Sequence, residues 1–240
     1  MSNPKAAMLV IGDEILSGRT RDSNMHHLAQ ELTRVGINLA EVRIVADDRG
    51  AIIGALQVLA GQYDEVFTSG GIGPTHDDIT ADCVAAAFGL GLTVRDDARA
   101  ILAAHYARAG TELNPARLRM ARIPDGAVLI DNPVSAAPGF SVGQVHVMAG
   151  VPAVFQAMLA GVLPRLTGGQ PLMSQTWRIM KGESEIAGPL AALAGDYPGL
   201  MIGSYPFNAN GIYGAHVVIR GHDGAAIDAA MLRLAALFPA

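Results

Sequence analysis

The stretch "DEVFTSGGIGPTHDDIT", residues 64–80, joins an apolar run to a glycine turn and then to two adjacent aspartates. Its first half, "DEVFTSGG", is typical of a buried strand that ends at the turn. Glycines at 70, 71 and 73 let the backbone turn sharply and leave amide N–H groups uncovered by side chains. The pattern after the turn predicts a helix from about Asp78 to Phe88. A strand, a turn and a helix in this order form one unit of an α/β protein.

Two similar strand and helix pairs precede this stretch. "AAMLVIG" (6–12) is a continuous apolar run, as expected of a strand buried on both faces, and a helical pattern follows over 22–36. "INLAEVRIVAD" (37–47) indicates a second strand and "RGAIIGALQVLAGQ" (49–62) a second helix. The alternation predicts a doubly wound, mostly parallel sheet with helices on both faces, a three-layer α/β domain.

The rest of the chain completes this domain and adds a small one. Helical patterns cover 97–122 and 152–166, and two more apolar runs, "AVLIDN" (127–132) and "QVHVMAG" (144–150), are strand candidates. "TGGQP" (167–171) has the composition of a linker, and the segments beyond it suggest a β-α-β-β-α unit. We therefore expect an α/β domain over 1–168 and a small α+β domain over 169–240.

Composition excludes several classes of protein. The formal net charge is −5, which argues against nucleic acid as a partner because binding the phosphate backbone requires clustered Lys and Arg. The single cysteine, Cys83, excludes a disulfide framework. No apolar stretch reaches the length of a membrane span, and the first residues do not form a signal peptide, so we expect a cytoplasmic protein without a membrane partner.

Polar turns follow all three of the first strands. They are "GDEILSG" (12–18), "ADD" (46–48) and "GGIGPTHDD" (70–78). In open parallel sheets, ligands bind outside the carboxyl ends of the strands. The three turns should therefore meet at one edge and form a site.

The glycine turn predicts a phosphate or carboxylate ligand. Its exposed N–H groups form an anion-binding nest at the start of a helix, to which Ser69 and Thr75 could add hydroxyl donors. Asp77 and Asp78 would repel that anion unless a divalent cation lay between them. The alternative is that one aspartate only caps the following helix.

The other two turns offer further carboxylates. Asp47 and Asp48 end the second strand, where the plainer interpretation is again a helix cap, and Asp13 and Glu14 follow the first strand. His76, inside the glycine turn, is either a general acid or metal ligand or a solvated side chain. These carboxylates have the ligand chemistry of a Mg²⁺ site.

Five separated motifs together resemble one superfamily. They are "GDEILSGRTRDSN", "VADDRGAI", "TSGGIGPTHDDIT", "NPVSAAPGF" and "VMAGVP". Their order and spacing resemble the molybdopterin-binding domain superfamily, and most of all its competence/damage-inducible protein A (CinA) branch. The resemblance covers roughly residues 5–166 and implies the same doubly wound α/β fold.

The resemblance also implies a reaction. Molybdopterin adenylyltransferases of the superfamily bind the pterin phosphate at the glycine turn and use two aspartates for metal-assisted adenylyl transfer. Those aspartates correspond here to Asp47 and Asp78, and the CinA branch is associated with metal-dependent cleavage of ADP-ribose. The implied ligand-binding residues are Gly12, Asn24, Ser69, Gly70, Gly71, Gly73, Thr75, Gly139 and Pro152. The implied metal ligands, for Mg²⁺ or Co²⁺, are Asp47, Asp78, Asp77, Asp13 and Glu14.

The small C-terminal unit resembles the KH-type domain of CinA proteins. Its only G-x-x-G, "GHDG" (221–224), is acidic and precedes the last helix, so a packing or dimerisation role is expected rather than RNA binding. The nicotinamide mononucleotide deamidase domain that follows in full-length CinA proteins is expected to be absent from this chain. The family's "PGVPPE" is "AGVPAV" (149–154) here, which leaves the substrate open.

Three functions remain as hypotheses. The first is metal-dependent hydrolysis of a nucleotide diphosphate such as ADP-ribose. The second is adenylyl transfer with molybdopterin as the ligand. The third is a module that holds a nucleotide or pterin without turning it over, and in each case a homo-oligomer is expected.

Overall fold

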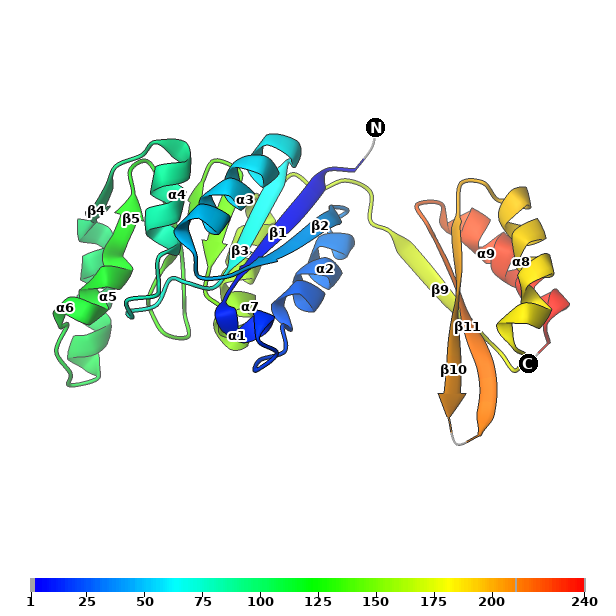
Figure 1. Cartoon of the computed structure of the whole chain (residues 1–240). Coiled ribbons are helices and arrows are strands. Elements are labelled where there is room, and N and C mark those ends of the chain that lie inside the picture. Colours follow the sequence, from blue (N-terminus) through cyan, green and yellow to red (C-terminus); the bar gives the residue numbers. More distant parts are fainter. Residues whose placement is uncertain (1–2, 210, 240) are drawn as a thin grey trace. The chain divides into compact units, whose positions relative to one another are not determined.

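The computed structural model describes residues 3–209 and 211–239, which fold as two compact units, Met1–Gly169 and Gln170–Ala240 (Figure 1). In chain order the elements of the first unit are β1 (Lys5–Ile11), α1 (Asp13–Leu16), α2 (Asn24–Arg34), β2 (Asn38–Val45), α3 (Arg49–Gln62), β3 (Glu65–Ser69), α4 (Thr80–Phe88), β4 (Leu92–Val94), α5 (Asp96–Arg108), α6 (Pro115–Leu118), η1 (Arg119–Ala121), β5 (Arg122–Pro124), β6 (Val128–Ile130), β7 (Gly139–Val142), β8 (Val145–Met148), α7 (Pro152–Val162) and η2 (Leu163–Arg165). Those of the second are β9 (Met173–Ile179), α8 (Glu183–Asp196), β10 (Met201–Ala209), β11 (Ile212–Gly221) and α9 (Gly224–Leu237).

The main sheet of the first unit is mixed but mostly parallel. Its strand order is β2-β1-β3-β8-β7-β6, in which β2, β1, β3 and β8 pair in parallel and β7 pairs antiparallel with β8 and β6. This confirms the predicted fold class. The strand β7 and the antiparallel pair β4–β5 were not expected from the sequence.

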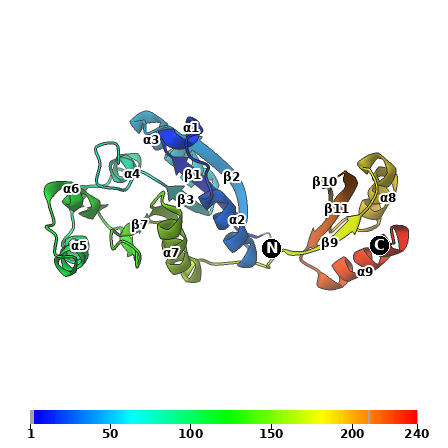
Figure 2. The same ribbon diagram turned by 90° about the horizontal axis from the view of Figure 1, so that it is seen from below.

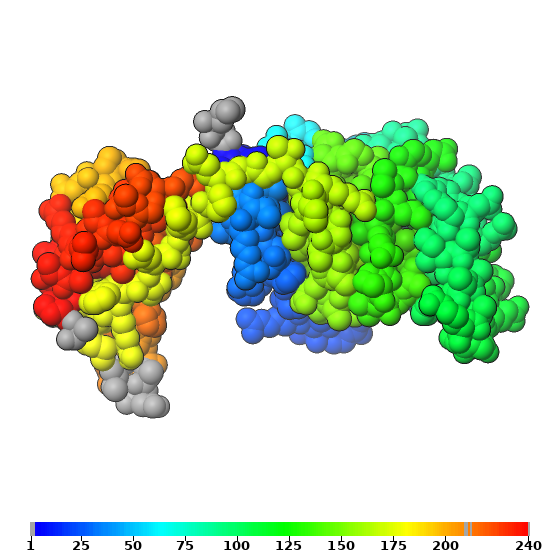
Figure 3. Space-filling model, turned by 180° about the vertical axis from the view of Figure 1, so that it is seen from behind, coloured from blue at the N-terminus to red at the C-terminus, as the bar shows by residue number. Residues whose placement is uncertain are grey.

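Strand β1 explains why the domain has three layers. Ala7, Leu9 and Ile11 face one hydrophobic cluster, which α3 and α4 complete. The alternate residues of β1 face the opposite cluster, which contains Leu28 and Leu32 of α2 and residues of α7. Figure 2 shows these two helix layers on either side of the sheet, and Figure 3 shows α7 beside α2 on one face. A strand buried on both faces must be apolar throughout, which is the pattern that predicted it.

Helix ends are fixed largely as the sequence indicates. The Asp48 carboxylate accepts a hydrogen bond from the Ala51 N–H at 2.8 Å and caps α3. Ser23, the N-cap residue of α2, makes no side-chain cap bond, but Asp22 before it accepts a hydrogen bond from the Met25 N–H. Gly36, with φ at +73°, lies just beyond the end of α2. Helix α4 differs from the prediction, because it begins at Thr80 and has no side-chain cap at Ile79.

The second unit is a three-stranded antiparallel sheet, ordered β10-β11-β9, covered on one face by α8 and α9. Its core contains Ile186 and Leu193 of α8, Ile227 and Leu234 of α9 and alternate residues of the strands. Trp177 is partly buried against this core and donates its indole N–H to the Phe238 carbonyl at 2.9 Å. The predicted β-α-β-β-α order is confirmed. No helix in the described part of the chain is long and apolar enough to span a bilayer.

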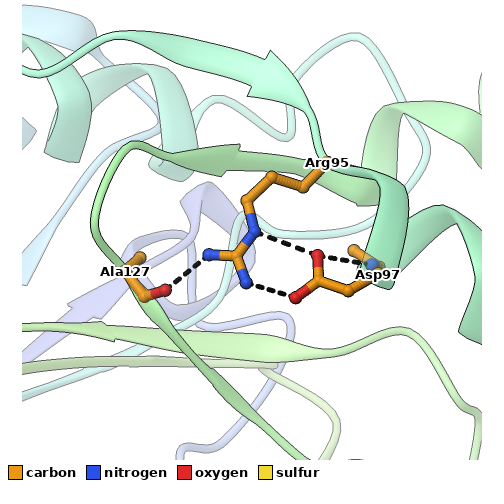
Figure 4. Close-up of polar contacts among 4 residues, drawn as sticks. Arg95, Asp97 and Ala127 are labelled. Atoms are coloured by element: carbon orange, nitrogen blue, oxygen red, sulfur yellow. Dashed lines mark hydrogen bonds and ion pairs between the residues drawn. The ribbon is translucent and has the colours of Figure 1, made fainter.

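Arg95 forms an ion pair at the start of α5 and a hydrogen bond to the turn before β6. Figure 4 shows the Arg95 guanidinium between the Asp97 carboxylate and the Ala127 carbonyl. Its Nε donates to Asp97 Oδ1 at 3.0 Å, and Nη2 lies on Asp97 Oδ2. The hydrogen bonds from Arg95 lower the pKa of Asp97 below its usual value. The charged pair therefore favours the folded state.

Replacing this carboxylate tests that contribution. We expect Asp97→Asn to lower the melting temperature by about 2 °C at pH 7, since partly exposed ion pairs contribute about 0.5–1 kcal/mol. Because the folded pKa is depressed, the stabilisation is present above the ordinary pKa of Asp and is lost as the pH falls through the folded value. Thermal melts of both proteins from pH 7 to pH 3 should therefore converge. A difference that stays constant over this range would contradict an electrostatic origin.

Candidate functional site

The carboxyl ends of β1, β2, β3 and β8 surround a cavity of about 550 Å³. Residues of all three predicted turns line it, including Gly12, Asp47 and Gly70. The expectation that these turns meet at one edge of the sheet is thereby confirmed.

The turn after β1 is tied to the end of β2. The Gly12 N–H donates to the Val45 carbonyl at 3.1 Å, and the Asp13 N–H donates to Asp47 Oδ2 at 3.0 Å. Glu14 folds back over Gly12. A Cβ atom added at Gly12 would lie 2.6 Å from the Glu14 carboxylate. A side chain at position 12 would therefore displace Glu14 from the cavity wall.

The glycine turn adopts a conformation that few residues other than glycine allow. Gly70 and Gly71 have φ values of +111° and +69°. The Thr80 hydroxyl donates to the Gly70 carbonyl and the Thr80 N–H to the Gly71 carbonyl, both at 3.0 Å. These bonds hold the turn against the start of α4.

The turn presents unpaired amide groups. Within the described part of the chain, the N–H groups of Gly71, Ile72 and Gly73 have no hydrogen-bond acceptor. All three residues line the cavity. Successive N–H groups without protein acceptors form a nest for an anion.

The Asp47 carboxylate is partly buried and close to other carboxylates. Burial raises the pKa of Asp47, and the negative charges of Asp13, Glu14 and Asp77 raise it further, while the hydrogen bond from the Asp13 N–H opposes them. No lysine or arginine pairs with Asp47 among the residues that the structure describes. Desolvated, unneutralised carboxylates at this edge create a potential that favours a cation.

Asp78 and Asp77 both line the cavity but differ in their contacts. Asp78 Oδ2 accepts from the Thr75 N–H at 2.8 Å and from its hydroxyl at 2.5 Å, so it braces the turn rather than capping α4. Asp77 lies on the surface, with the fully exposed His76 ring 3.9 Å away. Both hydrogen bonds from Thr75 end on the same oxygen of Asp78, so its Oδ1 accepts none from the described residues.

The structure separates the predicted ligand-binding residues into two groups. Gly12, Gly70, Gly71, Gly73 and Pro152 line the cavity. Asn24, Ser69, Thr75 and Gly139 do not.

Asn24 and Ser69, which do not line the cavity, form a buried hydrogen bond. Asn24 Nδ2 donates to the Ser69 hydroxyl at 2.8 Å and to the Gly150 carbonyl at 2.7 Å, and the Asn24 side chain is buried. Asn24 thus joins the start of α2, the end of β3 and the loop after β8. It supports the glycine turn from behind the cavity wall.

Several lining residues are not among the individual site residues predicted from the sequence, although some lie in the predicted turns. They are Ile11, Thr20, Ile72, Pro74, Met120, Asn132, Ser135, Ala137, Ala149, Gly150, Val151 and Val154. Asn132 folds its own loop, since its amide donates to the Ala137 carbonyl and its Oδ1 accepts from the Ser135 N–H. The motif "NPVSAAPGF" contained a signal for this loop, but residue types alone did not show that it closes the cavity.

No preassembled metal cage is present among the described residues. No three His, Cys, Asp or Glu side chains are grouped closely enough to hold an ion by themselves. The oxygen donors that line the cavity still fit a hard cation. Mg²⁺ keeps several waters and takes one or two carboxylates together with substrate phosphates.

Two protein families cover nearly the whole chain. Residues 7–168 match the family described as probable molybdopterin binding domain. Residues 171–240 match the family described as FAD synthase, middle domain. The second match differs from the KH-type resemblance drawn from the sequence, which stays a prediction.

Individual relatives are similar over the first unit and beyond. A CinA-like protein of Citrifermentans bemidjiense is 42% identical over 169 residues, which are 68% of this chain and 41% of that protein. A CinA-like protein of Geobacter metallireducens is 36% identical over 208 residues, 82% of this chain and 50% of that protein. The chain thus spans half or less of these two relatives.

A solved structure matches the first unit. The crystal structure of the protein CinA with unknown function from Thermoplasma acidophilum is 35% identical, with a TM-score of 0.63. The match covers 68% of this chain and 97% of that one.

Proposed function

The chain belongs to the probable molybdopterin binding domain family and is CinA-like. We propose that it is a metal-dependent phosphohydrolase that acts on a nucleotide diphosphate such as ADP-ribose. One observation carries the proposal. Residues with unpaired N–H groups and residues with unneutralised carboxylates line the same cavity. An anion and a cation can be bound there side by side, which is the requirement of metal-assisted phosphate chemistry.

In this proposal the backbone of the glycine turn binds phosphate and the carboxylates bind the metal. The N–H groups of Gly71, Ile72 and Gly73 hold phosphate oxygens. Asp47 and Asp78 supply the principal oxygen ligands for Mg²⁺ or Co²⁺, with Asp77, Asp13 and Glu14 nearby. A bound cation of this kind polarises a phosphoryl oxygen and lowers the pKa of water. The hydrogen bonds from Thr75 fix the orientation of the Asp78 carboxylate.

Metal dependence tests the proposal directly. Wild-type protein, stripped with a chelator and dialysed, should hydrolyse ADP-ribose only after Mg²⁺ or Co²⁺ is restored, with a rate change of about 100-fold or more. Release of AMP and ribose phosphate, followed by chromatography, is the measurement. A rate that is equal with and without the metal would contradict the assignment of these carboxylates.

The second candidate is adenylyl transfer to molybdopterin at the same cavity. It is favoured by the family match over 7–168, whose description names molybdopterin. Nucleotide binding with and without a pterin separates this candidate from hydrolysis, since cooperative binding of the two ligands is expected only for transfer. Retained, metal-dependent binding with no turnover of either kind would instead indicate a ligand-binding module.

A further inference from the structure

The sheet of the second unit has one face that its own helices leave uncovered. Helices α8 and α9 pack on the other face (Figure 1), where Ala215, Val217 and Ile219 of β11 are buried. The alternate residues of β11, among them His216 and Arg220, lie on the uncovered face. Within the second unit, this face is therefore open to a ligand.

The charges of this unit are divided between its two faces. Strands β9, β10 and β11 contain no aspartate or glutamate. The acidic residues of 170–240 all belong to α8, to α9 or to the N-cap of α9, and are Glu183, Glu185, Asp196, Asp223 and Asp228. Arg178 and Arg220 lie on the uncovered face of the sheet, which is therefore complementary to an anion.

A hollow of about 540 Å³, the sheet hollow, lies on this face. Its lining residues come from all three strands and are Ser174, Thr176, Tyr205, His216, Val218 and Arg220. Strand pairing places Arg220 opposite Ser174, and Tyr205 opposite His216. Directly opposed side chains on one face of a sheet lie about 5 Å apart, so these groups surround one space. Its volume is typical of a site for a small molecule.

The polar groups of the sheet hollow are donors without protein partners. The hydroxyls of Ser174 and Thr176 and the ring nitrogens of His216 form no hydrogen bond within the described residues. The His216 ring is stacked on Phe207, with 4.7 Å between the ring centroids. Hydroxyl, imidazole and guanidinium groups are donors suited to phosphate oxygens. The donor set therefore indicates a phosphate-bearing ligand.

Arg220 is the charged residue of the sheet hollow. Its Nη2 donates to the Tyr205 hydroxyl at 2.7 Å, while its Nε is buried against the protein. No carboxylate pairs with this guanidinium within the described residues. A half-buried guanidinium without a counterion is unfavourable until an anion binds to it. Because Tyr205 already holds the head group, little further ordering is needed for binding.

The same face favours a small ligand over a nucleic acid. Single-stranded nucleic acids bind in grooves that present several cations along the backbone. The second cation of this face, Arg178, lies 4.6 Å over the Phe207 ring and does not line the sheet hollow. One guanidinium suits one phosphate. Tyr205, which is 48% exposed, and Val218 offer apolar surface in the hollow for a planar ring.

We infer that the sheet hollow is a second ligand site, which binds a small phosphate monoester that carries a planar ring. Arg220 and the hydroxyls of Ser174 and Thr176 hold the phosphate, and the ring of the ligand lies against Tyr205. A guanidinium suits this task because its N–H groups match two phosphate oxygens at once. The site belongs to the second unit and does not depend on the reaction proposed for the cavity of the first.

Calorimetry on the full chain, with a chelator present, tests the phosphate contact. The probes are AMP, ribose 5-phosphate, adenosine and inorganic phosphate, which separate the phosphate from the ring. We expect Arg220→Ala to weaken the binding of AMP and ribose 5-phosphate about 10–100-fold, the value of hydrogen bonds to a charged group. Adenosine binding should change less than about threefold. Arg220→Lys should recover part of the loss, because it keeps the charge but not the planar fork.

Substitutions of Tyr205 test the ring contact. In wild type, AMP should bind more tightly than ribose 5-phosphate, because only AMP has a ring to place against Tyr205. Tyr205→Phe should keep this preference and lose only the contribution of the hydroxyl that orients Arg220. Tyr205→Ala should abolish the preference.

Arg233→Ala is the matched control. It removes an arginine of the same unit that lies on α9 and is paired with Asp196 at 2.6 Å. Its AMP affinity should equal that of wild type. Thermal melts establish that each variant is folded, and ADP-ribose hydrolysis should be unchanged in Arg220→Ala.

The outcomes judge this site separately from the proposed hydrolase. Equal AMP affinity in wild type and Arg220→Ala, or an equal loss for all four probes, overturns the inference. Wild type that binds none of the probes also overturns it, whatever the rate of ADP-ribose hydrolysis. A single-stranded oligoadenylate that binds far more tightly than AMP, and loses that affinity in Arg220→Ala, would assign the face to nucleic acid instead.

Discussion

Asp47→Asn should reduce ADP-ribose hydrolysis by about 100-fold or more while leaving the protein fully folded. Asp47 is a partly desolvated carboxylate of the cavity, close to Asp13, Glu14 and Asp77, and an amide carries no charge with which to hold a cation. The hydrogen bond from the Asp13 N–H can be kept in weaker form, since the Asn side-chain oxygen can also accept it. The loss should therefore appear in turnover and metal affinity, measured by initial rates over a range of Mg²⁺ concentrations.

The same substitution should not lower stability. Burial and the like charges of its neighbours raise the pKa of Asp47, so the folded protein binds its proton more tightly than the unfolded chain does. The contribution of protonated Asp47 to the free energy of unfolding is therefore present at low pH. It is lost as the pH rises through the pKa of Asp47 in the folded protein. At pH 7 without metal, the melting temperature of Asp47→Asn should equal or exceed that of wild type. The difference should disappear below the ordinary pKa of Asp, about 3.9.

Asp48→Asn provides the control, because Asp48 is next to Asp47 in the chain and is the same residue type with different contacts. Its carboxylate caps α3 through the Ala51 N–H, and asparagine caps helices about as well. Activity should stay at the wild-type level. Equal losses in the two variants would show that Asp47 has no special part in the reaction.

Gly70→Ala should be the most destabilising single substitution in the glycine turn, at about 3 kcal/mol. A Cβ atom at this position would lie 2.1 Å from the Ile11 carbonyl oxygen, and φ is +111°. The clash is with buried backbone of the central strand, which cannot move aside as the end of a flexible side chain can. We expect the melting temperature to fall by about 6–12 °C.

Gly54→Ala is the matched control for this effect. Gly54 lies within α3 and has open space where its Cβ would be. Alanine there should raise stability by about 0.5–1 kcal/mol through helix propensity. Urea unfolding of both variants measures the two changes, and a Gly70→Ala protein as stable as wild type would show that the turn is not held as described.

Much of the fold could be predicted because local patterns were decisive. Strand β1 is buried on both faces, so every residue from Ala6 to Ile11 had to be apolar. Strand β7 was missed because "GFSV" is too short and mixed to indicate a strand. It is a strand because it pairs with β8 and β6.

The site was predicted in outline for a similar reason. Parallel strands bring their carboxyl ends to one edge, so the order of strands and turns was enough to gather Gly12, Asp47 and the glycine turn. The sequence did not show that the loop at Asn132 closes the cavity, because residue types alone do not indicate how a loop packs.

The sequence by itself therefore determined which segments are buried, how they alternate and at which edge the polar turns collect. Tertiary structure decided the role of each carboxylate in that group. Asp47 and Asp48 are chemically identical neighbours, yet Asp48 turns to the Ala51 N–H of its own helix and Asp47 to the N–H of Asp13, 34 residues away. Hydrophobic burial follows from residue type, but the role of a charged group depends on its neighbours in space, which local sequence does not specify.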